Sequence, residues 1–281
     1  MSLRVAGSFA LLLSMLFATS ARAQPANDAW ANRTVVAALP FSASQPQAGT
    51  ATNDPTDPDP PCRSVSSNPL LFSIWFGFTT GAQPVYLDGA IGGSDLAAVI
   101  AVYTGSPGSF RIVSAACGRR GQGPGFPPRF GGVRLAPNTS YSILVGSLFP
   151  VAPDTPFTVT LAPSTIRQVT KTTDTNDGAC DGDCSLREAI SAAASTGGAV
   201  LLPSGMYVLS VAGGGDDANA TGDLDVAPFT GIYGAGAGVT ILQSVTGDRV
   251  LDLAPSSFGR PDYGNFAIAD LTIRGGNAYG Q

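Results

Sequence analysis

Four apolar strand centres recur at a nearly constant interval in the second half of the chain, at Leu209, Ile232, Leu253 and Ile273. The steps between them are 23, 21 and 20 residues, and glycine- and aspartate-rich turns such as residues 213–217 lie between them. A period near 20 residues that carries both strands and turns is typical of a β-solenoid. Each coil of a solenoid stacks its inward side chains on the next coil, so no coil is stable alone. We therefore predict that this part of the chain forms three or four coils of a parallel β-helix.

A short amphipathic helix is predicted immediately before the first coil, over residues 186–195. Ser185 and Glu188 have the spacing of a capping box, in which each side chain accepts a hydrogen bond from the backbone N–H of the other residue. Leu186 and Ile190 fall on one face of this helix together with two alanines. Such a helix covers the apolar end of the first coil and hides its unpaired strand edge.

Residues 184–190 read Cys-Ser-Leu-Arg-Glu-Ala-Ile, and an Asp- and Asn-rich stretch at 174–183 precedes them. Together with further matches at 201–207 and 222–225, this run resembles the start of the CSLREA family. The resemblance covers residues 169–277. It implies a right-handed parallel β-helix of the kind found in polymorphic outer-membrane-type surface proteins.

The first half of the chain follows a different pattern, with strand-sized apolar runs separated by turn clusters. The runs lie at residues 70–78, 85–87, 96–103, 110–113, 140–145 and 157–161. This spacing predicts an antiparallel β-sandwich. Within it, Trp75, Phe76 and Phe78 are expected to fill the space between the two sheets.

This half resembles the bacterial pre-peptidase C-terminal domain, a small jelly-roll-like β-sandwich. The matching segments are residues 25–32, 74–78, 96–105, 141–146 and 157–159. The resemblance implies an appendage of a secreted protein that binds or positions other molecules. One departure is that Gly118, Arg119 and Arg120 follow Cys117, where family members often carry acidic residues. The cation site that the family builds there is therefore not expected in this chain.

Residues 1–23 have the features of a secretory signal peptide, with Arg4, an apolar stretch at 5–18 and a small-residue cleavage site ending at Ala23. The apolar stretch is shorter than the roughly 20 residues that a membrane span needs. We predict a secreted or cell-surface protein without a transmembrane segment after signal removal. The expected domains are the signal peptide at 1–23, the β-sandwich at 24–163, and the helix cap with the first β-helix coils at 164–281.

All four cysteines lie after the predicted signal peptide. An even number of cysteines in an exported chain predicts two disulfides. Their positions favour one pair in each domain, Cys62 with Cys117 and Cys180 with Cys184. A Cys-x3-Cys metal site is the alternative, but four ligands for a tetrahedral ion are not close together in the sequence.

A group of carboxylates near the start of the second predicted domain is a candidate calcium site, formed by Asp174, Asp177, Asp181 and Asp183. Carboxylate oxygens suit this ion, but the spacing does not match an EF-hand loop. The alternative is turn chemistry, in which Asp and Asn side chains accept hydrogen bonds from their own backbone. No other cofactor is predicted.

The chain has no histidine, which excludes Ser-His-Asp and Cys-His nucleophilic chemistry and His-ligated zinc. Asp223 and Asp225 are the best candidate carboxylate pair, because alternation places both on one face of a strand. Arg249 and Arg274 are candidate positive partners. The pair lies beside the helix cap, where few neighbouring coils exist to build a substrate groove, so we predict no catalytic residues.

The net charge of −5 argues against binding to nucleic acid. We predict a non-catalytic binding or adhesion protein that presents a β-helix to an extracellular glycan or a surface protein. The alternative is a secreted carbohydrate-active enzyme, a polysaccharide lyase or hydrolase, whose catalytic coils lie beyond residue 281. Residues 271–281 contain no closing cap, so we expect the chain to be the N-terminal fragment of a longer protein.

Overall fold

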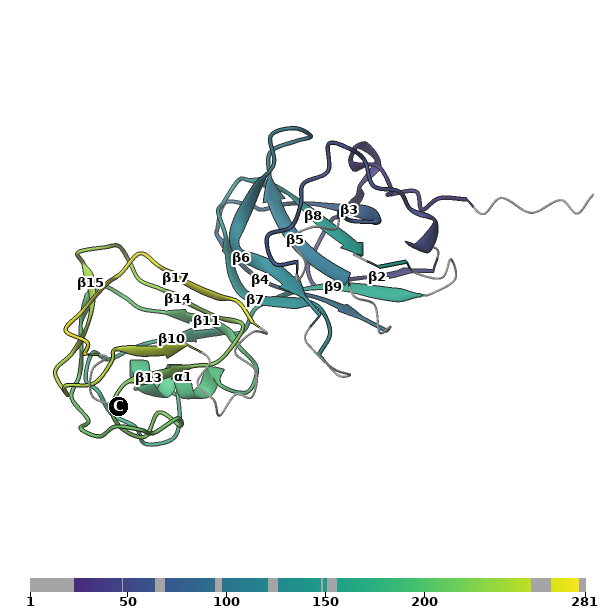
Figure 1. Cartoon of the computed structure of the whole chain (residues 1–281). Coiled ribbons are helices and arrows are strands. Elements are labelled where there is room, and N and C mark those ends of the chain that lie inside the picture. Colours follow the sequence, from purple (N-terminus) through teal and green to yellow (C-terminus); the bar gives the residue numbers. More distant parts are fainter. Residues whose placement is uncertain are drawn as a thin grey trace, which may run out of the picture.

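A computed structural model describes residues 23–46, 48–63, 69–93, 98–120, 126–147, 149–150, 156–253 and 264–277. The predicted signal peptide lies outside the described residues except for Ala23. The described chain is mostly β-structure and forms two bodies, which Figure 1 shows next to each other. Residues up to Pro163 build a β-sandwich, and residues from Ile166 onward build a β-solenoid. The predicted combination of a sandwich and a solenoid is confirmed.

The sandwich consists of two mostly antiparallel sheets. The first sheet has the order β1 (Thr34–Val36), β3 (Phe72–Thr79), β8 (Ser140–Ser147), β5 (Ala98–Thr104) and β6 (Arg111–Arg119). The second has the order β2 (Phe41–Gln45), β9 (Phe157–Pro163), β4 (Val85–Gly92) and β7 (Arg129–Leu135). Two short 3-10 helices lie near the N-terminus, η1 (Trp30–Asn32) and η2 (Ala48–Thr50). The exception to antiparallel pairing is β1, which runs parallel to β3.

Strand β3 buries side chains on both of its faces. Phe76 and Phe78 lie in the core between the two sheets, as predicted. Trp75 does not lie there, because successive side chains of a strand point to opposite faces. It belongs to a second buried cluster, where its ring stacks on Phe110 with 5.0 Å between the ring centroids and Trp30 packs beside it.

The solenoid has three faces, and strands of successive coils pair in parallel on each of them. The first face contains β10 (Ile166–Gln168), β11 (Gly198–Leu201), β14 (Thr230–Tyr233) and β17 (Phe266–Ala269). The second contains β12 (Gly205–Leu209), β15 (Thr240–Ser244) and β18 (Thr272–Arg274). The third contains β13 (Leu224–Val226) and β16 (Leu251–Leu253). In chain order these strands make about three turns.

The predicted period of about 20 residues is wrong. Residues that stack on one another are farther apart in sequence, 27 positions for Leu224 and Leu251 and 36 for Ile232 and Ile268. The four strand centres read from the sequence lie on all three faces, with Leu209 and Ile273 on the second, Ile232 on the first and Leu253 on the third. Apolar runs mark strands, but they do not tell which face of a coil a strand occupies.

The predicted helix is present as α1 (Leu186–Ala193), and it ends two residues before the predicted position. Ser185 Oγ accepts a hydrogen bond from Glu188 N at 3.2 Å, and Glu188 Oε2 accepts one from Ser185 N at 2.6 Å, so the capping box forms. Leu186 and Ile190 are buried in the solenoid core. The helix packs against β10, β11 and β13, which confirms that it covers the first coil.

Both predicted disulfides are present. Cys62 is bonded to Cys117 with 5.7 Å between the Cα atoms, and Cys180 is bonded to Cys184 with 4.4 Å. The first bond joins a loop to β6 in the sandwich, and the second closes a short loop directly before α1. Each domain therefore has its own disulfide, and the alternative of a cysteine metal site is excluded for these four residues.

The sandwich packs directly on the first face of the solenoid, where β7 lies against β11 and β14. The hydroxyl of Tyr233 donates to Gly132 O at 2.7 Å and accepts from Arg134 N at 2.9 Å. Gly132 has φ +65°, and a Cβ atom at this position would lie 2.4 Å from Gly198 O. Glycine is therefore required for the close approach of the two backbones.

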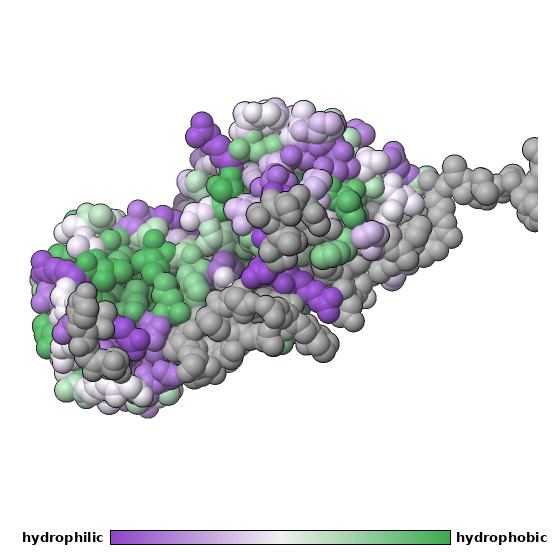
Figure 2. All heavy atoms as spheres, in the orientation of Figure 1, coloured by the Kyte–Doolittle hydropathy of each residue, from purple (hydrophilic) through white to green (hydrophobic). Residues whose placement is uncertain are grey.

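The last two described coils leave apolar side chains at the surface. Leu253, Ile268 and Ile273 are all more than a third exposed. Figure 2 shows an apolar area on the solenoid over the region of β17. Among the described residues, no helix combines the length and the apolar character that a membrane span requires.

Candidate functional site

Two carboxylates stack on the third face of the solenoid, one on each of two successive coils. The strands β13 and β16 are in register, so Asp225 pairs with Asp252. Leu224 and Val226 beside Asp225 point into the core, and the aspartate therefore points outward. Asp217 reaches the same place from the loop before β13, and one carboxylate oxygen of each of the three residues lies within 4.8 Å of the others. We name this trio of Asp217, Asp225 and Asp252 the carboxylate cluster.

Asp225 is fully buried although it points away from the core. The loop before β13 folds over it, and Asn219 N donates to Asp225 Oδ2 at 3.2 Å. The Asn219 side chain also exchanges two hydrogen bonds with the Asp225 backbone, at 3.0 and 2.7 Å. Asp225 Oδ1 has no hydrogen-bond partner. Burial, reinforced by the nearby Asp223 and Asp217 charges and opposed by the Asn219 N–H, raises the pKa of Asp225 to about 6.

Arg249 brings positive charge to one side of this cluster. Its Nε lies 2.9 Å from Asp223 Oδ2, and its Nη1 lies 2.9 Å from Asp252 Oδ2. The contact with Asp223 has the distance of an ion pair without the alignment of a hydrogen bond. Burial and the charges of Asp248 and Asp252 outweigh the opposing effect of Arg249, so the pKa of Asp223 is raised.

The candidate pair of Asp223 and Asp225 is not accessible to a polymeric substrate, because the two residues are only 1% and 0% exposed. Of the two arginines considered as their partners, Arg249 is in contact with Asp223. Arg274 instead donates to the side chain of Gln243 at 2.9 Å. This geometry suits a cation or a structural role better than acid-base chemistry on a glycan.

The four aspartates of the predicted calcium loop have separate partners. Asp174 pairs with Arg187 at 2.7 Å, and Asp183 pairs with Lys171 at 2.9 Å. Asp177 and Asp181 each accept a hydrogen bond from the backbone N–H two positions later. The contacts of Asp177 and Asp181 are the turn hydrogen bonds of the alternative interpretation. The four carboxylates point to separate partners and do not meet at one position where an ion could bind.

Arg187 holds the loop before β13 against α1. It is fully buried, and it donates to both carboxylate oxygens of Asp174 at 2.7 and 3.1 Å. It also donates to four backbone carbonyls at 2.8 to 3.4 Å, those of Asn219, Thr221, Gly222 and Asp223. The same loop carries Asp217 and covers Asp225, so Arg187 positions the carboxylate cluster without belonging to it.

We expect acid to destabilise the solenoid through Glu188. Burial acts to raise the pKa of this carboxyl, but hydrogen bonds from Ser185 N, Asp177 N and the Thr175 hydroxyl outweigh it and lower the pKa. A carboxyl with a lowered pKa stabilises the fold above its unfolded value of about 4.3, and this contribution is lost as the pH falls through the folded value. The loss of stability between pH 5 and pH 3, measured by urea unfolding, should therefore be smaller in Glu188→Gln than in the unmodified chain. An equal loss in both proteins would contradict this assignment.

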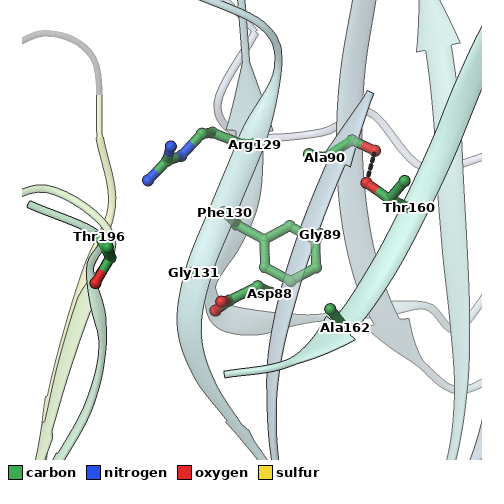
Figure 3. Close-up of a pocket in the computed structure, with 9 residues that line it drawn as sticks. All are labelled: Asp88, Gly89, Ala90, Arg129, Phe130, Gly131, Thr160, Ala162 and Thr196. Atoms are coloured by element: carbon green, nitrogen blue, oxygen red, sulfur yellow. Dashed lines mark hydrogen bonds between the residues drawn. The ribbon is translucent and has the colours of Figure 1, made fainter. Parts of the chain in front are cut away.

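A hollow with a volume of about 190 Å³ lies where the sandwich meets the solenoid. Its lining includes Asp88, Arg129, Phe130 and Thr160 from the sandwich and Thr196 from the solenoid. Figure 3 shows the Arg129 side chain extending from its strand toward the segment that carries Thr196. The Asp88 carboxylate accepts hydrogen bonds from Gly132 N at 2.8 Å and from the Ser164 hydroxyl, so it is already engaged.

Arg129 is shared between this hollow and a smaller one of about 40 Å³. The smaller hollow is also lined by Arg119 and by the Cys62–Cys117 disulfide. The Arg129 guanidinium lies 3.8 Å from the centroid of the Phe229 ring. Within the described residues, no carboxylate pairs with Arg129. The junction of the two domains therefore offers a guanidinium to an anionic ligand.

Sequence reasoning missed Asp217, Asp252 and Arg129. The signal for Asp252 was available, because the triplets at 224–226 and 251–253 both read Leu-Asp-apolar. Triplets of the same pattern in stacked coils place their aspartates side by side once the register is known. The role of Asp217 depends on the path of a long loop, and the role of Arg129 depends on the packing of the two domains. Neither leaves a local pattern in the sequence.

No family model matches the chain. Among curated proteins, the chain is 37% identical over 102 residues to mannuronan C5-epimerase AlgE3 of Azotobacter vinelandii. This match covers 35% of this chain and 5% of that protein. It is 36% identical over 104 residues to mannuronan C5-epimerase AlgE4 of the same organism, covering 35% of this chain and 18% of that protein. The matches thus span less than a fifth of these relatives' own length.

Two solved structures show weaker likeness. The pre-peptidase C-terminal domain of a collagenase from Bacillus anthracis matches 50% of this chain and 97% of its own length, with 12% identity and a TM-score of 0.29. The catalytic domain of a GH87 α-1,3-glucanase in complex with nigerose matches 83% of this chain and 51% of its own length, with 12% identity and a TM-score of 0.20. The CSLREA resemblance stays a prediction.

Proposed function

We propose that this chain is part of an extracellular protein that binds an acidic polysaccharide of the mannuronan type. The observation that carries the proposal is the similarity of about a third of the chain to several mannuronan C5-epimerases. Each sugar residue of a uronan carries a carboxylate, and arginine is the side chain best suited to bind carboxylates. Two disulfides fit an oxidising compartment outside the cytoplasm.

The domain junction supports this proposal, because it combines a hollow with an arginine that has no carboxylate partner in the described part of the chain. The guanidinium of Arg129 rests on the Phe229 ring, which restrains its orientation. Arg119 lines the adjoining hollow. A chain of uronate units that lies along the junction meets the Arg129 guanidinium.

We further propose that residues 1–23 direct export and that residues 24–163 and 164–281 act as separate units of one binding protein. In this proposal the solenoid is of the CSLREA type, and the sandwich orients it toward the glycan. The buried state of Asp223 and Asp225 favours a binding role for the described coils over catalysis by this pair.

A second candidate function is that the chain contributes to a carbohydrate-active enzyme. The curated relatives favour it, because they are epimerases. The test is incubation of the chain with mannuronan, followed by proton NMR of the polymer. New signals from C5-epimerised residues, or unsaturated ends from a lyase, would favour the enzyme over the binding protein.

The binding proposal predicts that the purified chain associates with mannuronan and not with a neutral glucan, as measured by isothermal titration calorimetry. Arg129→Ala should weaken mannuronan binding about tenfold, which corresponds to about 1.4 kcal/mol. The matched control is Arg111→Ala, because Arg111 is an exposed arginine at the opposite end of β6 from Arg119. Equal binding to both polymers, or equal weakening by the two variants, would contradict the proposal.

A further inference from the structure

We infer that the solenoid binds one calcium ion between its first and second coils, with Asp217, Asp225 and Asp252 as ligands. The inference does not depend on the glycan proposal, because the site lies on the third face of the solenoid and the domain junction is on the first face.

The spacing of the oxygen atoms fits calcium. One carboxylate oxygen from each residue of the carboxylate cluster lies within 4.8 Å of the other two. Two ligands on opposite sides of one calcium ion are about 4.8 Å apart, since calcium–oxygen distances are about 2.4 Å. Magnesium demands a near-ideal octahedron, whereas calcium accepts six to eight oxygen ligands in a flexible arrangement. Two coil positions and one loop position do not form such a regular frame.

The second observation is the orphaned oxygen of Asp225. This residue is fully buried, and its Oδ1 has no hydrogen-bond partner while its Oδ2 accepts from Asn219 N. A buried carboxylate oxygen without a partner leaves the desolvation of the charged group uncompensated. A bound cation compensates for it, and carboxylate oxygens are the ligands that calcium prefers.

The arginine beside the cluster does not replace a cation at Asp225. Arg249 lies at ion-pair distance from Asp223 and Asp252. Within the described residues, no ion pair joins it to Asp225. Arg249 thus offsets the charge on one edge of the cluster, and the stacked Asp225–Asp252 pair keeps an excess of negative charge at its centre.

The ion would connect a loop with two strands of successive coils. Asp225 belongs to the first coil and Asp252 to the second, and Asp217 is on the loop that covers them. Calcium therefore stabilises the stacking of the two coils and fixes the loop that Asn219 and Arg187 already hold. The site is distinct from the calcium loop predicted at residues 174–183.

The test is calcium binding by the EDTA-treated full chain, measured by isothermal titration calorimetry and by the thermal unfolding midpoint. We expect one calcium ion per chain and a higher midpoint with calcium than with an equal concentration of magnesium. Asp217→Asn and Asp252→Asn should each weaken calcium binding by about tenfold or more, since affinity depends on the number of charged ligands. Asp217 is on a loop and only partly buried, so its variant tests the site even where a change at buried Asp225 prevents folding.

The matched control is Asp181→Asn, which removes the same charge from an exposed position in the 174–183 loop. This variant should bind calcium like the unmodified chain. Absence of calcium binding to the EDTA-treated chain would overturn the inference. Unchanged binding in Asp217→Asn and Asp252→Asn would also overturn it, and a loss confined to Asp181→Asn would place the ion in the other loop. Equal effects of magnesium and calcium would overturn the assignment to calcium.

Discussion

Arg187→Met should lower the free energy of unfolding of the solenoid by about 3–5 kcal/mol. Methionine keeps much of the side-chain volume, but it leaves Asp174 without its buried partner. It also removes the donor from four backbone carbonyls of the loop before β13. Unpaired buried polar groups carry the full cost of their desolvation, which makes this the most damaging single change that we expect in the solenoid.

Urea unfolding followed by circular dichroism measures this effect. Both tryptophans, Trp30 and Trp75, lie in the sandwich, so tryptophan fluorescence reports on that domain separately. The double variant Arg187→Met/Asp174→Asn should recover part of the loss, because it removes the uncompensated charge. Arg274→Met, at an exposed arginine, should change stability by less than about 0.5 kcal/mol. Similar losses in Arg187→Met and Arg274→Met would refute the proposed role of Arg187.

Removal of the Cys62–Cys117 bond by the double variant Cys62→Ala/Cys117→Ala should destabilise the sandwich by about 4 kcal/mol. The bond joins residues 55 positions apart, and the loss of chain entropy that it imposes on the unfolded state grows with loop length. The transition of Trp30 and Trp75 fluorescence in urea should therefore move to a lower concentration.

The Cys180–Cys184 bond provides the comparison within the same chain. It joins residues only 4 positions apart, so Cys180→Ala/Cys184→Ala should cost about 2 kcal/mol by the same relation. This loss should be seen by circular dichroism and should leave the fluorescence transition of the sandwich nearly unchanged. A larger loss for the short loop than for the long one would show that loop entropy does not govern these bonds.

The features predicted correctly from the sequence are those encoded by short-range patterns. The capping box depends on Ser185 and Glu188 three positions apart, and the pairing of the cysteines follows from their separation into two domains. The solenoid period was mispredicted because it depends on long loops. The loop over residues 210–223 adds length to a coil without adding an apolar strand centre.

The candidate sites were harder to predict, since each combines residues from distant segments. Asp225 was singled out with Asp223, its neighbour on the same strand, but its partner in space is Asp252, 27 positions away. The alternation rule identifies residues on one strand face, whereas register between coils is set by the complete path of the chain. Arg129 gains its position only when β7 packs on the solenoid.

The contact between β7 and the first face of the solenoid has a consequence for the order of folding. All strands of the sandwich precede residue 164 in the chain, so this domain can be complete before the coils are available. Strands β11 and β14 can then pack on the surface of β7. The Tyr233 hydroxyl fixes this contact by donating a hydrogen bond to Gly132 O. The sandwich also contacts β17, so successive coils meet the same preformed surface as each stacks on the coil before it. The sandwich therefore fixes how the coils are aligned with one another along the first face, in addition to the stacking of each coil on its neighbour.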